Sequence, residues 1–187
     1  MDYQDPGWRN VLGVALIRAT VIGLVWKRAR LSHLPTILET IRSIFLGIAV
    51  SIWLILFVLS FVSPFDVPDS LLWWVLPVVG LGVVVGWVMR SVEGRLVRAR
   101  NEQQLVSAYR SFFFVQLGLA EAVALVGFVL SFLAGSAWVY LVGAAMSSID
   151  LWLMAPSRRN IVRIQERLNA AGVPVSLGAA LTTQETP

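Results

Sequence analysis

A carboxylic acid, Glu121, lies in the middle of an apolar run at 112–135 that reads FFFVQLGLAEAVALVGFVLSFLAG. An ionisable side chain at the centre of a membrane span costs about 2.5–3.5 kcal/mol, so such residues usually face protein and often take part in function. Because hydrocarbon disfavours the charged form, we expect this carboxyl to bind a proton. Three interpretations are open: the proton exchanges, the neutral carboxyl only donates a hydrogen bond to a neighbouring helix, or an arginine of another subunit pairs with it.

A second acid, Asp150, lies near the end of another apolar run, at 137–154, and two serines precede it by about one turn. One predicted role is an ion pair in the membrane interface with Arg90, Arg158 or Arg159. The alternative role is a relay that passes protons between the cytoplasm and the first acid.

The residue types that most other chemistry requires are scarce in this chain. It has no cysteine and a single histidine, His33, which excludes disulfides, thiolate nucleophiles and a metal site built from several histidines of one chain. The sequence contains no nucleotide-binding loop, metal-ligand cluster or nucleophile elbow. We therefore predict a non-enzymatic protein with no cofactor and no metal, whose net charge of +4 serves membrane topology and not nucleic acid.

The composition predicts an all-α integral membrane protein. Hydrophobic residues make up 57% of the 187 residues and charged residues 14%, a balance that is too apolar for a soluble domain of this length. Four stretches approach the roughly 20 apolar residues that a bilayer core requires. These four predicted transmembrane helices are 41–62, 71–89, 112–134 and 137–154.

Charged residues are sorted between the two sides of these spans. The connection 63–70 carries Asp66 and Asp69 and no cation, whereas the connection 90–110 and both flanks are rich in arginine. The positive-inside rule therefore predicts that both the N and the C terminus are cytoplasmic. Of the 15 cationic residues only Lys27 is a lysine, a bias that indicates a high-GC bacterial genome and hence the bacterial plasma (inner) membrane.

Two terminal segments, 1–35 and 157–187, flank the predicted four-span transmembrane domain at 36–156. In the first segment, residues 8–26 form an apolar stretch that Arg18 interrupts. We expect this stretch to be an interfacial helix on the cytoplasmic face, with an inserted or re-entrant element as the alternative.

The C-terminal segment begins with a predicted cytoplasmic amphipathic helix. Ser157 can cap its start and Gly172 suits its end. Its apolar stripe consists of Ile161, Ile164 and Leu168. Arginines occupy much of the remaining surface, so we expect this helix to bind anionic lipid headgroups or to dock on another subunit.

The second and third spans are predicted to form one long helical hairpin with a cytoplasmic turn at 100–102; the alternative is an ordinary basic loop of broken helix between them. Asn101 is a good N-cap, and Gln104 stands three residues later, as in a capping box. Counting back equally from Asn101 puts Leu81 level with Glu121. The carboxyl is therefore expected to face the glycine-rich part of the second span.

Small residues at helical spacing occur on both arms of this hairpin. They are Gly80, Gly82 and Gly86 on the second span, and on the third span Gly118 with Ala122 and Gly127 with Ser131. Such residues permit close helix approach in lipid. They predict tight helix packing and either a homo-oligomer or association with other membrane subunits.

The run LGLAEAVALVGFVLSFL at 117–133 carries a glutamate flanked by alanines, and a glycine-rich span and a basic turn precede it. In this order, the stretch 77–135 resembles the c subunit, or proteolipid, of rotary ATP synthases. The resemblance implies a c-subunit-like central hairpin, assembly into a membrane ring, and a proton- or sodium-binding carboxylate at Glu121. The level of Glu121 in the second span offers no side-chain oxygen, which favours a proton over sodium. The alternative function is a structural or scaffold subunit of a larger membrane complex with no ion-transport role.

Overall fold

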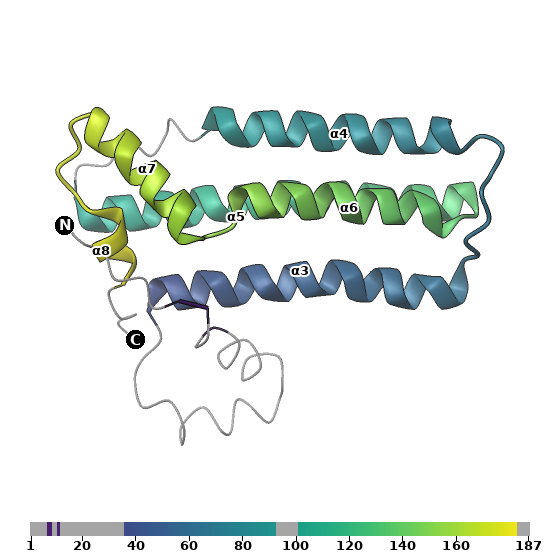
Figure 1. Cartoon of the computed structure of the whole chain (residues 1–187), viewed down its shortest axis with the longest axis horizontal. Helices are drawn as coiled ribbons and strands as arrows, with labels where there is room; N and C mark the ends of the chain where they lie inside the picture. Colours follow the sequence, from purple (N-terminus) through teal and green to yellow (C-terminus); the bar gives the residue numbers. More distant parts are fainter. Residues whose placement is uncertain (1–6, 9–10, 12–35, 93–100, 183–187) are drawn as a thin grey trace, which may run out of the picture. The chain divides into compact units, whose positions relative to one another are not determined.

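The computed structural model describes residues 7–8, 11, 36–92 and 101–182, and every regular element in these ranges is a helix. The helices are α3 (Ile37–Val62), α4 (Leu71–Val92), α5 (Glu102–Ala134), α6 (Ala137–Met154), α7 (Arg158–Ala170) and α8 (Leu177–Leu181) (Figure 1). The predicted interfacial helix at 8–26 falls almost wholly outside the described residues.

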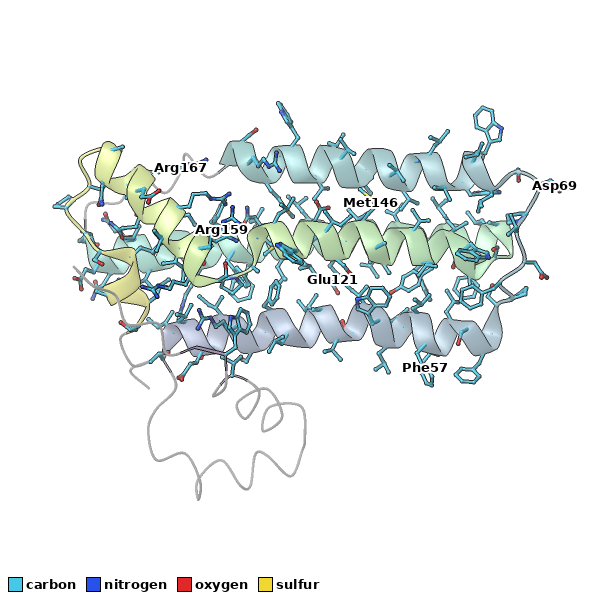
Figure 2. The ribbon with its side chains drawn as sticks, in the orientation of Figure 1. Phe57, Asp69, Glu121, Met146, Arg159 and Arg167 are labelled. Atoms are coloured by element: carbon cyan, nitrogen blue, oxygen red, sulfur yellow. The ribbon has the colours of Figure 1, made fainter. Side chains whose placement is uncertain are left out.

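Four of these helices, α3 to α6, are long and apolar enough to cross a membrane, which confirms the four predicted spans. The α6 helix begins and ends at the predicted residues, and α4 begins at the predicted residue. The α5 helix begins at Glu102, so it extends well beyond the apolar stretch, as the hairpin prediction required for this arm. Large apolar side chains on the spans are exposed, among them Phe57, which points away from the neighbouring helices (Figure 2).

Polar side chains define where these helices begin. Asn101 accepts a hydrogen bond from the Gln104 backbone N–H at 2.8 Å, which confirms the predicted N-cap of α5. At α3, Thr36 and Glu39 form a reciprocal capping box, which was not predicted. The Thr36 N–H donates to Glu39 Oε2 at 2.9 Å, and the Glu39 N–H donates to Thr36 Oγ1 at 3.2 Å. Local sequence therefore specifies these helix starts.

The chain divides into two compact units, and the helices α3 and α5 each contribute residues to both. Unit 1 comprises residues 1–47, 94–111 and 156–187, and unit 2 comprises residues 48–93 and 112–155. Unit 2 therefore contains most of the apolar length of the four spans, whereas unit 1 contains the start of α3, the start of α5, and the helices α7 and α8.

In unit 1, Arg42 is completely buried although its side chain is charged. Its Nε donates to the Pro156 carbonyl and its Nη1 to the Gly7 carbonyl, both at 2.9 Å, and the guanidinium lies 4.9 Å from the centre of the Trp8 ring. These contacts join three distant parts of the chain. Nothing in the sequence pattern distinguished Arg42 from the other arginines next to the spans.

The predicted amphipathic helix of unit 1 is confirmed as α7. Ser157 caps it, and the stripe of Ile161, Ile164 and Leu168 is buried. Gly172 has a φ of +74°, the left-handed conformation that ends many helices. The side chain of Gln165 then accepts the Leu177 N–H at 2.6 Å, which joins α7 to the start of α8.

In unit 2, α6 contacts the three other spans. Gly143 on α6 approaches Gly127 on α5, so closely that a Cβ atom on Gly127 would lie 3.0 Å from the Gly143 Cα. Met146 on α6 lies against Gly82 on α4, and α4 and α6 run side by side (Figure 1). The Tyr140 hydroxyl donates to a backbone carbonyl of α3 at 2.8 Å.

At one end of unit 2, the connection between α3 and α4 is bonded to the turn between α5 and α6. Backbone carbonyls of residues 64–66 accept the Ala137 N–H at 2.9 Å, the Trp138 Nε1–H at 2.7 Å and the Ser136 hydroxyl at 2.7 Å. Gly135, with a φ of +65°, makes the tight turn that its position between two spans predicted. These bonds hold the α3–α4 pair and the α5–α6 pair together at this end.

Candidate functional site

Glu121 lies on the part of α5 that belongs to unit 2, near the middle of its apolar stretch, and its side chain is half-buried. Figure 2 shows Met146 pointing from α6 toward α4, whereas Glu121 lies on the other side of the α6 ribbon from α4. Glu121 forms no hydrogen bond or ion pair with any residue that the structure describes. Its carboxyl is therefore partly open to the surroundings of the unit.

Asp150 lies at almost the same depth as Glu121. The antiparallel helices α5 and α6 cross where Gly127 meets Gly143. Glu121 is six residues before Gly127 and Ile149 is six residues after Gly143, so these two residues lie at the same depth. Asp150 is one residue further, a rise of about 1.5 Å. The sequence contains this signal, since Glu121 lies 14 residues before Gly135 and Asp150 lies 14 residues after Ser136, the two residues of the turn. No prediction was based on it.

The surroundings of Asp150 differ from those of Glu121. Its side chain is only 2% exposed, and its Oδ2 has no hydrogen-bond partner among the described residues. Its Oδ1 lies 3.0 Å from the position that a Cβ atom on Gly86 would occupy, so the absence of a side chain at Gly86 makes room for the carboxyl. Ser147, one turn earlier on α6, is also buried, and its hydroxyl has no partner either.

The predicted ion pair between Asp150 and Arg90 does not form. Arg90, in the last turn of α4, is exposed, and Asp150 makes no ion pair with a described residue. The carboxyl points toward Gly86, one turn before Arg90, because α4 and α6 pack at that glycine. The relay role of Asp150 stays a prediction.

The predicted partner of the glycine-rich face of α4 was wrong. Gly82 and Gly86 face Met146 and Asp150 of α6, and do not face Glu121. The Gln116 Nε2 donates to the Met89 carbonyl at 3.3 Å, and this bond sets the register between α4 and α5.

Glu121 is five residues after Gln116 on α5, and Val84 is five residues before Met89 on α4. The bond between Gln116 and Met89 therefore puts Glu121 level with Val84. The predicted level was Leu81. The equal count assumed two arms of identical length around Asn101, and residues 93–100 of the first arm are outside the described ranges.

Five of the predicted packing residues divide into two groups. Gly82 and Gly86 do mediate close helix approach, with α6 as the partner. Gly80 and Gly118 would have no heavy atom within 4 Å of an added Cβ, and Ala122 is half-buried. Among the described residues, Gly80 and Gly118 therefore make no close helix contact.

The described part of the spans in unit 2 thus presents two carboxyl groups, the half-buried Glu121 and the buried Asp150. Within the described ranges no group of three or more His, Cys, Asp or Glu side chains could hold a metal ion.

Comparison of the chain with protein families, with characterised proteins and with solved structures finds no match. Its function is therefore inferred from its own residues.

Proposed function

We propose that this protein is a non-enzymatic, multi-pass protein of the bacterial plasma membrane that binds a proton at Glu121 and assembles into an oligomer. The observation that carries this proposal is the position of Glu121: the middle of a span, half-buried, and without a partner among the described residues. A carboxylate left ionised in hydrocarbon is strongly unfavourable, and a bound proton removes its charge.

The absence of an acceptor among the described residues argues against one of the three interpretations of Glu121. A neutral carboxyl that only packs two helices together would donate its O–H to a backbone or side-chain oxygen nearby. No described residue accepts such a bond from Glu121. This favours a carboxyl that exchanges its proton, or one whose partner belongs to another molecule.

The same surface supports assembly. Gly118, one turn before Glu121, is exposed and has open space around its Cα. In lipid, a small residue beside a polar group is typical of an interface between helices. The resemblance of 77–135 to the c subunit of rotary ATP synthases supports the same conclusion, with a c-subunit-like hairpin of α4 and α5 and a second copy against the Glu121 surface.

The orientation that we propose has both termini in the cytoplasm, where the exposed Arg158 and Arg159 at the start of α7 would contact anionic lipid headgroups. Cysteines introduced at Asp66 and at Thr183 are expected to react with an impermeant thiol reagent from opposite sides of the membrane. Reaction of both from the periplasmic side would reject the orientation.

The decisive experiment is labelling with dicyclohexylcarbodiimide, which modifies protonated carboxyls that lipid can reach. Wild-type protein in membranes is expected to be labelled, and Glu121→Gln is expected to abolish labelling with little effect on folding. Asp150→Asn is the matched control: it removes an acid of the same depth that is buried, and it should leave labelling intact. The proposal fails if wild-type protein resists the reagent across the pH range and Glu121→Gln behaves as wild type in cells.

A scaffold subunit is the second candidate function, and the open carboxyl supports it equally if a different protein supplies the hydrogen-bond acceptor. Purification from native membranes with measured stoichiometry separates the two candidates. A homo-oligomer supports the first, and a fixed ratio to a different subunit, retained in Glu121→Gln, supports the second.

A further inference from the structure

Among the described residues of unit 2, two buried polar side-chain atoms lack a hydrogen-bond partner, and both belong to α6. They are the Ser147 hydroxyl and Asp150 Oδ2, on side chains that are 0% and 2% exposed. Buried polar groups without a hydrogen bond are rare in folded proteins, because they lose their contacts with water and gain nothing in return. Two such atoms one turn apart therefore require an explanation.

Both side chains lie on one stripe of α6 that faces two helices. Gly143, Ser147 and Asp150 follow one another at steps of four and three residues, so they share a helix face. A Cβ on Gly143 would lie 3.3 Å from a carbonyl oxygen of α5 and 3.5 Å from a Val78 methyl group of α4. The stripe therefore faces the junction of α4, α5 and α6.

The junction contains no described charge that could neutralise Asp150. On α4 the nearest charged residue is Arg90, which is exposed, and on α5 it is Glu121, which is also an acid. The part of α3 in this unit, residues 48–62, contains no ionisable residue. On α5, the residues at the levels of Ser147 and Asp150 are the buried Val123 and Ala120.

From this geometry we infer that Asp150 and Ser147 form a second proton-binding site, enclosed between α4, α5 and α6 at the depth of Glu121. A proton from a hydronium ion adds to Oδ2 of the carboxylate: one O–H bond forms on the acid, and the O–H bond of the donor breaks to leave water. The product is a neutral acid, which can stay in the junction where an unpaired carboxylate could not. We assign Ser147 as a positioning residue, because its hydroxyl is one turn away on the same face and, like Asp150 Oδ2, has no hydrogen-bond partner among the described residues.

A proton suits this site better than a metal cation. The site offers two kinds of side-chain oxygen, one carboxylate and one hydroxyl, whereas Ca²⁺ takes about six to eight oxygen ligands and Mg²⁺ about six. The backbone carbonyls around it belong to continuous helices and are already used in helical hydrogen bonds. A single proton, in contrast, needs only one carboxyl oxygen.

Infrared spectroscopy of the full chain in liposomes tests this inference, because the carbonyl stretch of a protonated carboxyl is separate from the bands of a carboxylate. The measurements use the Glu121→Gln background, so that the result does not depend on the function proposed for Glu121. We expect a carbonyl band at neutral pH that shifts in heavy water and disappears in Asp150→Asn. Persistence of the whole spectrum in Asp150→Asn would overturn the inference.

Two matched pairs of variants test the site while Asp150 itself is kept. Ser147→Ala is expected to shift the Asp150 band, and Ser148→Ala is not, because the Ser148 hydroxyl donates to the Ala144 carbonyl at 2.7 Å. Likewise Gly86→Ala should shift the band by displacing the carboxyl, whereas Gly80→Ala should not. Equal shifts of the band within both pairs of variants would contradict the inference. A carbonyl band that appears only when Na⁺ is removed would also contradict it, because a metal cation would then occupy the site in place of the proton.

Discussion

Glu121 and Asp150 lie at one depth on neighbouring helices, and their surroundings are opposite. The α5 surface around Glu121 is open: Gly118 beside it has no neighbour within 4 Å of an added Cβ. The junction around Asp150 is closed: Gly86 leaves room for the carboxyl on one side, and buried apolar residues of α5 occupy the levels on the other. Depth in the bilayer is therefore not what distinguishes these acids. The packing of α6 against both α4 and α5 encloses Asp150 and leaves Glu121 half-buried.

The comparison depends on the close crossing of α5 and α6, and breaking this crossing should have the largest effect. Gly127→Leu would place a side chain where a Cβ already comes within 3.0 Å of backbone, which cannot yield as a flexible side chain can. Overpacking of this kind costs about 1–3 kcal/mol, and we expect the upper end or more. Unfolding in detergent with a denaturant measures it. Gly118→Leu, on the open surface of the same helix, is the control, and equal losses in both variants would show that the crossing is not tight.

The open surface of Glu121 is tested by association. If a second copy covers it, Glu121→Leu is expected to weaken association by about 1–2 kcal/mol through the lost hydrogen bond, while Glu121→Gln keeps a donor and retains most of the affinity. Energy transfer between labelled copies at varied detergent concentration measures this difference. A wild-type protein that stays monomeric at every concentration would mean that lipid, or a different protein, covers this surface.

The closed junction is tested by two glycines on α4. Alanine is favoured over glycine in a helix by about 0.5–1 kcal/mol. Gly80→Ala is expected to show this gain, because an added Cβ would contact nothing. Gly86→Ala is expected to show no such gain in stability, because its Cβ would lie 3.0 Å from Asp150 Oδ1. Thermal unfolding of the two variants provides the comparison, and equal stability gains would show that the carboxyl does not fill the space at Gly86.

The smallest effect is expected for Asp150→Asn. An acid that is already neutral resembles asparagine in shape and charge, so the free energy of unfolding should change by less than about 1 kcal/mol. An ionised carboxylate in a buried ion pair would behave differently, since removal of one partner of such a pair costs about 3–5 kcal/mol. Unfolding at neutral pH in the same detergent decides between these values. A loss in the larger range would identify a cationic partner of Asp150 outside the described residues.

The sequence alone determined the local features of this protein. The four apolar stretches predicted the four spans, because the thickness of a bilayer sets the length of an apolar helix. Asn101 and Ser157 predicted the starts of α5 and α7, since a cap bonds a backbone N–H only a few residues away. The two-residue connection at Gly135 likewise predicted a tight turn. Each of these features depends on residues close together in the chain.

The partner of each helix face was decided only by the tertiary structure. Gly82 and Gly86 allow any neighbouring helix to pack closely against α4. Their spacing therefore predicted a close helix contact, but it did not predict that α6 is the neighbour. The same holds for Arg42, which resembles the other arginines in sequence and is distinguished by bonds to Pro156 and Gly7. Whether an acid in an apolar helix is enclosed or open depends on which neighbour packs beside it. That choice follows from the fit of several helix surfaces at once, which spacing along one helix does not encode.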